Sequence, residues 1–376
     1  MKLKGLVPDN QPTNVHLPHE RWQYGEIREG RKIVDPILQY GCYVLGYENK
    51  EILDFVCKII KNNKPEIGEN FMPKTNKIVL NKISVDFSNK IYDVTGMNSF
   101  FALSGSDSNE GAVKLASAYH FEKGNIKKKY IASFENSYHG STYLTSSLGH
   151  DNFMVNPFYT MESAGCVKKL PRDFDEYSVN WSEISAIMLE TCPYGKVMEP
   201  PSVEFWKKLD RIRKKHDVLI IIDDIFMGGG KTGTYLGWKN LDIEPDISTM
   251  GKAITGGFFP LSMVLFTDRV RNSLPNDFFW EHGFTYNFSL PGIASAMKYL
   301  EILERDKILE EHENIVKTAR HIIEDEGFRI KYQFGTHFKI ANEHQSHFYV
   351  VPINATEEYF ETLKDNLQWF TQNTTR

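Results

Sequence analysis

Val218-Leu-Ile-Ile-Ile-Asp-Asp-Ile225 is the stretch on which the predicted fold depends, because an apolar run of strand length ends in two adjacent carboxylates. Such uniformly apolar runs are typical of strands buried on both faces in a parallel sheet. Ligands bind at the carboxyl ends of strands in these sheets, so Asp223 and Asp224 stand where a site is expected. A buried strand end needs a cationic partner for its acids. The plainer alternative is that both acids are solvated in a loop.

Three further apolar runs alternate with amphipathic helical stretches, which predicts an α/β fold with a mainly parallel sheet. These candidate strands are Ser99–Leu103, Tyr130–Phe134 and Ala186–Glu190. Past residue 292 a charged helical stretch is followed by the alternating segment Ser346–Pro352, which indicates a smaller α+β domain. We therefore expect a large domain over residues 46–292 and a small domain over 293–376. The irregular, aromatic residues 1–45 are expected to pack on the small domain or on a partner subunit.

The composition is that of a globular enzyme, with 376 residues, 41% hydrophobic residues and a formal net charge of -5. This charge gives no electrostatic footprint for nucleic acid, which is not an expected partner. Four cysteines without a CxxC pair predict neither a disulfide framework nor a metal site. No signal-peptide core or membrane-spanning run is present, so we expect a soluble, cytoplasmic protein without a membrane partner.

Ser104-Gly-Ser-Asp-Ser-Asn-Glu110 follows a candidate strand and opens a helix with one buried face. Asp107 and Glu110 have the spacing of a capping box, and Gly105 would let a ligand approach the backbone. Free amides at a helix start bind phosphate well. Taken alone, the stretch fits an ordinary capped turn better than a phosphate site.

A second glycine-rich stretch, Gly228-Gly-Gly-Lys-Thr-Gly233, has the Gly-Lys-Thr of a nucleotide-binding P-loop. A P-loop requires a glycine five residues before Gly230, and Ile225 stands there. The spacing therefore argues against an NTPase.

Lys252 lies in Ser248-Thr-Met-Gly-Lys-Ala-Ile-Thr-Gly-Gly257, among small and apolar residues. A lone lysine is most often a solvated surface residue. These neighbours suit instead an amine in a confined site that can form an imine.

With these elements in this order, the sequence resembles the class III aminotransferases, a branch of the fold-type I pyridoxal-phosphate enzymes, from about Gly30 to about Leu303. The resemblance implies a large domain with a mainly parallel seven-stranded sheet, a small α+β domain and pyridoxal 5'-phosphate as cofactor. It makes Lys252 the Schiff-base lysine and Asp223 the partner of the cofactor's ring nitrogen, the two catalytic residues.

The resemblance also assigns the residues around the cofactor. Gly105, Ser106 and Asp107 would hold its phosphate, and Tyr138, in the aromatic-His-Gly motif with His139, would stack on its ring. Glu190 would support the site, and Ile225 would lie against the other ring face. In the segment His282-Gly-Phe-Thr285, Thr285 would reach the phosphate of the neighbouring subunit, which implies a homodimer with shared active sites.

Several positions depart from the family pattern. Phe226 stands where many members have a glutamine that bonds the cofactor's phenolic oxygen, and Lys231 replaces the usual arginine. No arginine lies between Arg329 and Arg376, so the small domain lacks the arginine that many members use for a substrate carboxylate. This favours a diamine, polyamine or omega-amino compound as amine donor. Aromatic residues near the start, Tyr43 and Trp22, are candidates for the pocket wall, although core packing explains them equally well.

The expected reaction is transfer of an amino group from such a donor to a 2-oxo acid by a ping-pong mechanism, with Lys252 moving the proton at the substrate carbon. One rival is an aminomutase of the glutamate-semialdehyde type on the same scaffold. Another is a non-catalytic protein with this fold, which would be expected to lack the lysine or the aspartate.

Overall fold

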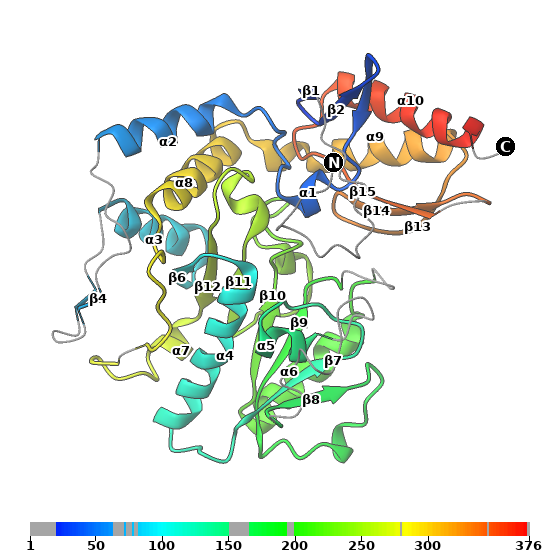
Figure 1. Ribbon diagram of the computed structural model, residues 1–376. Coiled ribbons are helices and arrows are strands. Elements are labelled where there is room, and N and C mark those ends of the chain that lie inside the picture. Colours follow the sequence, from blue (N-terminus) through cyan, green and yellow to red (C-terminus); the bar gives the residue numbers. More distant parts are fainter. Residues whose placement is uncertain are drawn as a thin grey trace, which may run out of the picture.

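The computed structural model describes residues 20–62, 71–72, 77–78, 82–149, 165–193, 199–278, 280–343 and 346–373. A central sheet with helices on both faces forms the larger part, and a smaller three-stranded sheet with two helices lies beside it (Figure 1). None of the helices within these residues is long and apolar enough to cross a membrane.

The central sheet has seven strands in the order β6-β12-β11-β10-β9-β7-β8. All neighbours along it are parallel except β12, which runs antiparallel to both β11 and β6. The strands are β6 (Asn98–Ala102), β7 (Tyr130–Phe134), β8 (Val167–Leu170), β9 (Ile184–Glu190), β10 (Leu219–Asp223), β11 (Ile247–Met250) and β12 (Ser262–Phe266). The four strands predicted from apolar runs are therefore present, and the mainly parallel seven-stranded sheet is confirmed.

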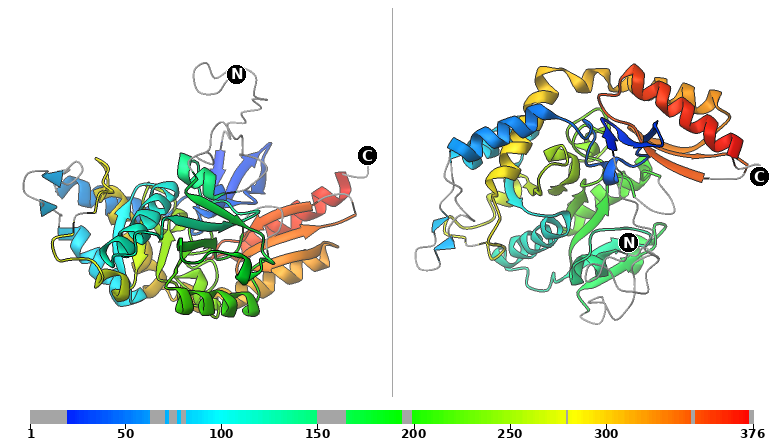
Figure 2. Two further views of the ribbon diagram at one scale, coloured as in Figure 1. Left: turned by 90° about the horizontal axis from the view of Figure 1, so that it is seen from below. Right: turned by 45° about the horizontal axis from the view of Figure 1, so that its top comes forward.

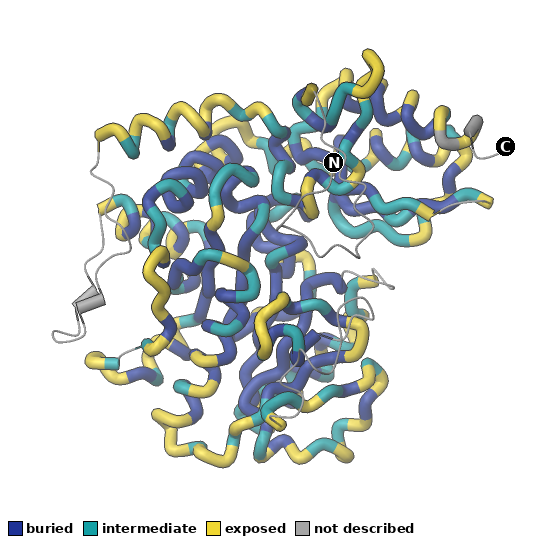
Figure 3. The backbone as a smooth tube through the Cα atoms, viewed as in Figure 1, coloured by how far each residue is buried: buried dark blue, intermediate teal, exposed yellow. Residues whose placement is uncertain are grey.

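The two faces of this sheet have separate apolar cores because side chains alternate along a strand. Ile220 and Ile222 of β10 belong to one core, and Leu219 and Ile221 belong to the other. Figure 3 shows the sheet as the most continuously buried part of the molecule. The helices of the large part are α1 (Leu38–Gly41), α2 (Lys50–Asn62), α3 (Lys82–Thr95), α4 (Gly105–Glu122), α5 (Tyr143–Leu148), α6 (Val203–His216), α7 (Asp268–Arg271) and α8 (Leu290–Arg305).

Short 3-10 turns complete the connections: η3 (Glu176–Ser178), η4 (Gly237–Asn240), η5 (Lys252–Thr255) and η6 (Ile308–Glu311). A two-stranded pair, β4 (Phe71–Met72) and β5 (Lys77–Ile78), lies apart from the main sheet.

The smaller part contains the antiparallel strands β13 (Arg329–Phe334), β14 (His337–Ala341) and β15 (Ser346–Val350) with the helices α9 (His312–Asp325) and α10 (Glu357–Asn373). An N-terminal sheet of β1 (Glu20–Trp22), β2 (Gly25–Arg28) and β3 (Arg31–Val34) packs against α10, as Figure 2 shows. Trp22, Tyr24 and Val34 share one apolar core with α9, α10 and β14.

The boundary expected between residues 292 and 293 falls inside α8. Buried residues of this helix, among them Ala294, Tyr299 and Leu303, belong to the core of the large part. The helical periodicity of the sequence after residue 292 predicts a helix. It does not predict which of the two apolar cores the apolar face of that helix packs against.

Candidate active site

Asp223 lies at the carboxyl end of β10, almost fully buried, and accepts three hydrogen bonds. Its Oδ2 accepts from Nδ1 of His139 at 2.9 Å and from Nδ2 of Asn109 at 2.8 Å. Its Oδ1 accepts from the backbone amide of Ile225 at 3.1 Å. A carboxylate held in this way is pre-oriented to accept a proton-bearing ring nitrogen.

Asn109 is a site residue that sequence reasoning missed. Its Nδ2 also donates to the backbone oxygen of His139 at 2.7 Å, and its Oδ1 accepts from the hydroxyl of Thr249 at 2.7 Å. Its position one helical turn after Gly105 was a weak signal, because the side chain of a polar helix residue is as often solvated as buried.

The start of α4 is the segment expected to form a phosphate cradle, and its cap differs from the one predicted. The cap is Ser104, whose Oγ accepts from the amide of Asp107 at 3.2 Å, while Asp107 Oδ2 accepts from the amide of Leu103 at 2.9 Å. The expected capping box of Asp107 with Glu110 is therefore wrong by one helical turn. The amides of Gly105 and Ser106 have no acceptor within the described residues, which leaves them available to an anion.

Close packing around this cradle explains why residues 105 and 140 are glycines. A Cβ at Gly105 would lie 2.8 Å from Cδ1 of Ile225, so Ile225 packs directly on the cradle. A Cβ at Gly140 would lie 2.3 Å from Oγ of Ser106, and Gly140 has a φ of +131°. The Tyr138–Ser141 loop is pressed against the cradle in this way, and the amide of Ser141 donates to Ser106 Oγ at 3.0 Å.

Glu190, at the end of β9, anchors this loop by accepting from the amide of Tyr138 at 3.0 Å. The site thus gathers the carboxyl ends of β9 and β10, the start of α4 and the loop after β7. Sequence reasoning placed these residues at strand ends, and the strand order brings the ends side by side.

Lys252 begins η5, immediately after β11, with a φ of +53° in the left-handed region that is unfavourable for a lysine. Non-glycine residues in this region cluster at functional sites. Burial lowers the pKa of its amine, and the nearby Cys42, Asp223 and Glu190 oppose this shift. Its Nζ lies 4.5 Å from the ring centre of Phe226. Burial thus favours the neutral form of the amine, which a nucleophile or base requires.

Two further ionisable groups are fully buried beside the site. Asp224 accepts from the hydroxyl of Thr191 at 2.6 Å and from the amide of Gly237 at 2.7 Å. Lys231 donates to the backbone oxygen of Gly228 at 2.6 Å. The glycine-rich stretch that resembles a P-loop is thus a buried turn that supports the site.

The two pocket residues predicted from the N-terminal segment lie in different places. The ring of Tyr43 packs against Gly257, just after the turn that carries Lys252, and contacts Phe258 edge-on. Trp22 is buried in the core of the small part, where its ring meets Tyr24 edge-on and its Nε1 donates to the backbone oxygen of Ile33 at 3.1 Å. The structure does not bring Trp22 to the site.

Thr285 is exposed and lies in a segment that is held against the cradle helix by His282. Nε2 of His282 donates to the backbone oxygen of Asp107 at 2.9 Å. The structure therefore brings the neighbouring His282, rather than Thr285, into contact with the cradle of its own chain.

Comparison with known proteins decides the family. A sequence model of the family Aminotransferase class-III matches residues 9–329. The chain belongs to the class III aminotransferases. It is an aminotransferase, and its cofactor is pyridoxal phosphate.

Relatives and solved structures agree with this assignment. The chain is 28% identical to gamma aminobutyrate transaminase 2 of Solanum lycopersicum over 333 residues, which are 80% of this chain and 70% of that protein. It is 27% identical to putrescine–pyruvate aminotransferase of Pseudomonas aeruginosa over 75% of this chain and 66% of that protein. A transaminase from the marine bacterium Virgibacillus has the same fold with a TM-score of 0.81, at 18% identity and with 92% and 89% of the two chains covered. The omega transaminase from Pseudomonas jessenii in complex with PMP has a TM-score of 0.77 at 18% identity, with 94% and 90% covered.

The residues gathered at this edge of the sheet fit the cofactor of this family. The cradle offers two free amides, the buried network around Asp223 offers an oriented acid, and Lys252 offers an amine with a lowered pKa. These three features lie at one edge of the sheet, as a single small phosphorylated ligand requires.

Proposed function

We propose that the protein transfers an amino group from an omega-amino compound, that is, one whose amine is at the end of a carbon chain, to a 2-oxo acid by a ping-pong mechanism. Among the relatives are a gamma aminobutyrate transaminase, a putrescine–pyruvate aminotransferase and a diaminobutyrate–2-oxoglutarate transaminase. The first two of these names describe donors with a terminal amine, and they support a donor of this kind here. An α-amino acid is less favoured because no arginine lies between Arg329 and Arg376.

The observation that carries the proposal is the convergence of Lys252 and the Asp223 network on the cradle. When bound, pyridoxal phosphate supplies an electron sink that stabilises negative charge at the substrate carbon. Asp223, oriented by His139 and Asn109, would keep the proton on the ring nitrogen. Lys252 would hold the cofactor's aldehyde carbon and, when released, accept the proton from the substrate carbon at Nζ.

We propose further that Gly105 and Ser106 hold the phosphate through their amides, that Tyr138 and Ile225 enclose the ring, and that Tyr43 forms part of the pocket wall. Asp107 then supports the start of α4 and does not bind the phosphate through its amide, because that amide donates to Ser104 and its carboxylate accepts from the amide of Leu103. Phe226 occupies the position beside Lys252 where many relatives place a glutamine, so the phenolic oxygen of the cofactor would have no partner from that residue.

A homodimer with shared sites is also part of the proposal. Phe284 and Tyr286 flank Thr285 and are 53% and 57% exposed, so an apolar patch surrounds the threonine expected to reach the partner. Exposed aromatic patches of this kind are typical of subunit interfaces.

The test is an amine donor screen with pyruvate and 2-oxoglutarate as acceptors, run on the wild type, Lys252→Ala and Lys58→Ala. We expect parallel double-reciprocal plots for the wild type and a loss of kcat of about 10²- to 10⁴-fold in Lys252→Ala, because proton transfer is lost. Lys58 is exposed on α2, so Lys58→Ala should match the wild type.

Reductive trapping with borohydride followed by peptide mapping provides a second readout, and the label should be on Lys252. Labelling of another lysine would contradict the assignment of Lys252. Turnover without any 2-oxo acid would favour the aminomutase reaction, and cofactor binding without turnover of any donor would contradict the aminotransferase proposal.

A further inference from the structure

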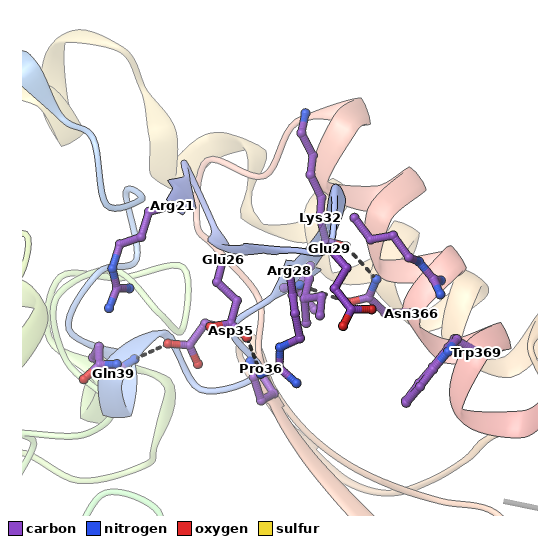
Figure 4. Close-up of a pocket in the computed structure, with 14 residues that line it drawn as sticks. Arg21, Glu26, Arg28, Glu29, Lys32, Asp35, Pro36, Gln39, Asn366 and Trp369 are labelled. Carbon is purple, nitrogen blue, oxygen red and sulfur yellow. Dashed lines mark hydrogen bonds and ion pairs between the residues drawn. The ribbon is translucent and has the colours of Figure 1, made fainter. Parts of the chain in front are cut away.

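A groove of about 690 Å³ lies on the small part, between the N-terminal sheet, the start of α1 and α10 (Figure 4). Arg21, Asp35 and Trp369 are among its lining residues, and no residue of the candidate site is. A contribution of the small part to the site must therefore come from another of its surfaces.

The sheet of β13, β14 and β15 meets the large part with one of its faces. Residues opposite each other in an antiparallel pair point to the same side, and neighbours along a strand point to opposite sides. His337 is paired with Val350, which is two residues from Phe348, so these three side chains share a face. Val350 belongs to a core of the large part, and Phe348 packs against that core. Phe338 and Tyr349, on the other face, belong to the core of the small part. His337 therefore points toward the large part.

His337 is a fully buried histidine, and among the described residues neither nitrogen of its ring has a hydrogen-bond partner. A buried polar group without a partner lowers stability, so native structures contain few of them. Burial and the charges of Lys231 and Lys252 lower the pKa of this imidazole well below its usual value, against an opposing effect of the backbone of Phe334. The neutral ring has one N–H donor and one acceptor. His337 can thus bond a polar atom of a ligand.

The ring of Phe226 connects His337 with Lys252. Its centre lies 4.7 Å from the ring centre of His337 and 4.5 Å from Nζ of Lys252. The rings of Phe226 and His337 are tilted by 58°. The histidine of the small part and the lysine of the large part thus contact the same side chain.

Two other polar groups near Lys252 are less suited to bind a ligand oxygen. The amine of Lys231 already donates to the backbone oxygen of Gly228 at 2.6 Å. The thiol of Cys42 is a weak donor, and burial raises its pKa. His337 differs from both because its N–H is a normal donor and has no acceptor within the described residues.

Pyridoxal phosphate has four polar groups, and the proposed function accounts for three of them. The cradle takes the phosphate, Asp223 takes the ring nitrogen, and Lys252 takes the aldehyde carbon. The fourth group is the phenolic oxygen, which stands on the ring carbon next to the one that carries the aldehyde. Attachment at Lys252 therefore brings this oxygen close to the lysine. The side chain of Phe226 has no polar atom to bond it.

We infer that His337 donates a hydrogen bond to the phenolic oxygen of the bound cofactor and so helps to position it. The inference rests on the proposed placement of the cofactor and goes beyond it, because it gives the small part a direct role in cofactor binding. A bond of this kind to an oxygen with negative charge is stronger than one between neutral groups. It also satisfies a buried nitrogen that is otherwise without a partner.

The experiment measures the binding of two ligands to the full-length protein freed of cofactor. They are pyridoxal phosphate and 3-deoxypyridoxal phosphate, which lacks the phenolic oxygen, and absorbance after dialysis gives the affinities. We expect His337→Phe, which keeps a ring of similar size, to lose about 10- to 100-fold in affinity for pyridoxal phosphate and much less for the deoxy ligand. Intrinsic differences between the ligands cancel, because both proteins meet the same pair.

Two further variants at this position distinguish a hydrogen bond from packing. His337→Met, which is flexible and apolar, should lose the same preference for pyridoxal phosphate as His337→Phe. His337→Gln keeps an N–H donor and should retain part of the preference. An equal loss of affinity for both ligands in His337→Phe and His337→Met overturns the inference, since the ring would then act through packing alone. Unchanged affinities in these variants overturn it as well.

His347→Phe is the matched control on the same sheet. His347 is paired with Ile340, which belongs to the core of the small part, and its ring contacts Phe328 edge-on. Its side chain therefore lies on the face away from Lys252. We expect this variant to bind both ligands as the wild type does, and a loss of the preference in His347→Phe would overturn the role given to His337.

Phe226→Gln provides a test of the position itself. The new amide stands beside Lys252 and can bond the same oxygen, so the loss caused by His337→Phe should become smaller in this background. An equal loss in both backgrounds would mean that His337 and residue 226 do not serve one oxygen, which contradicts the inference.

These binding measurements require no turnover, which separates the inference from the proposed function. If the preference for pyridoxal phosphate depends on His337 while no donor is turned over, the inference stands and the proposed amino transfer fails. If borohydride trapping labels Lys252 and donors are turned over, but the wild type and His337→Phe have the same preference, the inference alone fails.

Discussion

At the scale of single residues, the candidate site contains ionisable groups whose pKa values are shifted by burial. Lys252 and Asp224 lie at adjacent strand ends, yet burial shifts their pKa values in opposite directions, because it disfavours the charged form of each. For Lys252 the lowered pKa favours the neutral amine. For Asp224 it supplies an acid that folding makes harder to ionise.

The raised pKa of Asp224 predicts how the free energy of unfolding depends on pH. Burial raises the pKa of Asp224 from 3.8 to about 7, against the hydrogen bonds from Thr191 and Gly237. The folded protein therefore binds this proton more tightly than the unfolded chain. The contribution of this proton to the free energy of unfolding is fully present below pH 4 and is lost as the pH rises through 7.

We expect Asp224→Asn to remove this component, so that the wild type loses about 2 kcal/mol more stability than the variant between pH 5 and pH 7. Urea unfolding of both proteins at the two pH values measures the difference. Lys231, whose pKa burial lowers to about 7, is largely protonated in this window and adds little. The exposed Asp242→Asn should keep the wild-type slope, and equal slopes in Asp224→Asn and the wild type would contradict the burial argument.

At the scale of elements, the cradle is an assembly of a helix start and a loop from another strand. The first turn of α4 supplies amides, and the Tyr138–Ser141 loop closes on it through Ser106 and Gly140. The helix and its approximate start were predictable from the sequence, because a buried stripe follows a glycine-serine turn. The residue that caps this helix was not predictable, because Ser104 and Asp107 are both good capping residues and only the path of the backbone selects between them.

This packing predicts that Gly140→Ala weakens cofactor binding at least about tenfold. The new Cβ would lie 2.3 Å from Ser106 Oγ and 2.7 Å from Thr145 Oγ1, so the loop has to move away from the phosphate amides. Cofactor affinity is measured by absorbance after dialysis against known concentrations. Gly124→Ala is the control for backbone strain alone, because Gly124 has a φ of +75° but no atoms near its Cβ position. A similar loss of affinity in both variants would mean that strain, rather than the contact with Ser106, is responsible.

At the scale of the whole molecule, the proposed dimer makes cofactor binding depend on assembly. The double variant Phe284→Asp, Tyr286→Asp should shift the protein to monomers in sedimentation velocity, because it places charges in a desolvated interface. Its cofactor affinity should fall with the loss of the partner's Thr285. Tyr177→Asp alters a side chain that is 84% exposed on η3 and should leave both properties unchanged. A dimer that survives the double variant would show that this patch is not the interface.

The sequence by itself determined the class of fold and pointed to Asp223 and Lys252 as the candidate central residues. Apolar runs of strand length, each ending in a polar group, are local patterns, and the order of acid, glycine-rich turn and lysine is readable along the chain. These local signals predicted β7, β9 and β10 to within two residues, and they marked Asp223 and Lys252.

Only the tertiary structure decided which polar residues join them. Asn109, which the sequence did not predict, meets Asp223 because α4 and β10 converge at one edge of the sheet, and no local pattern encodes that convergence. The same reason places Trp22 in the core of the small part and not at the site. The direction of its side chain depends on which side of the short strand β1 that part covers.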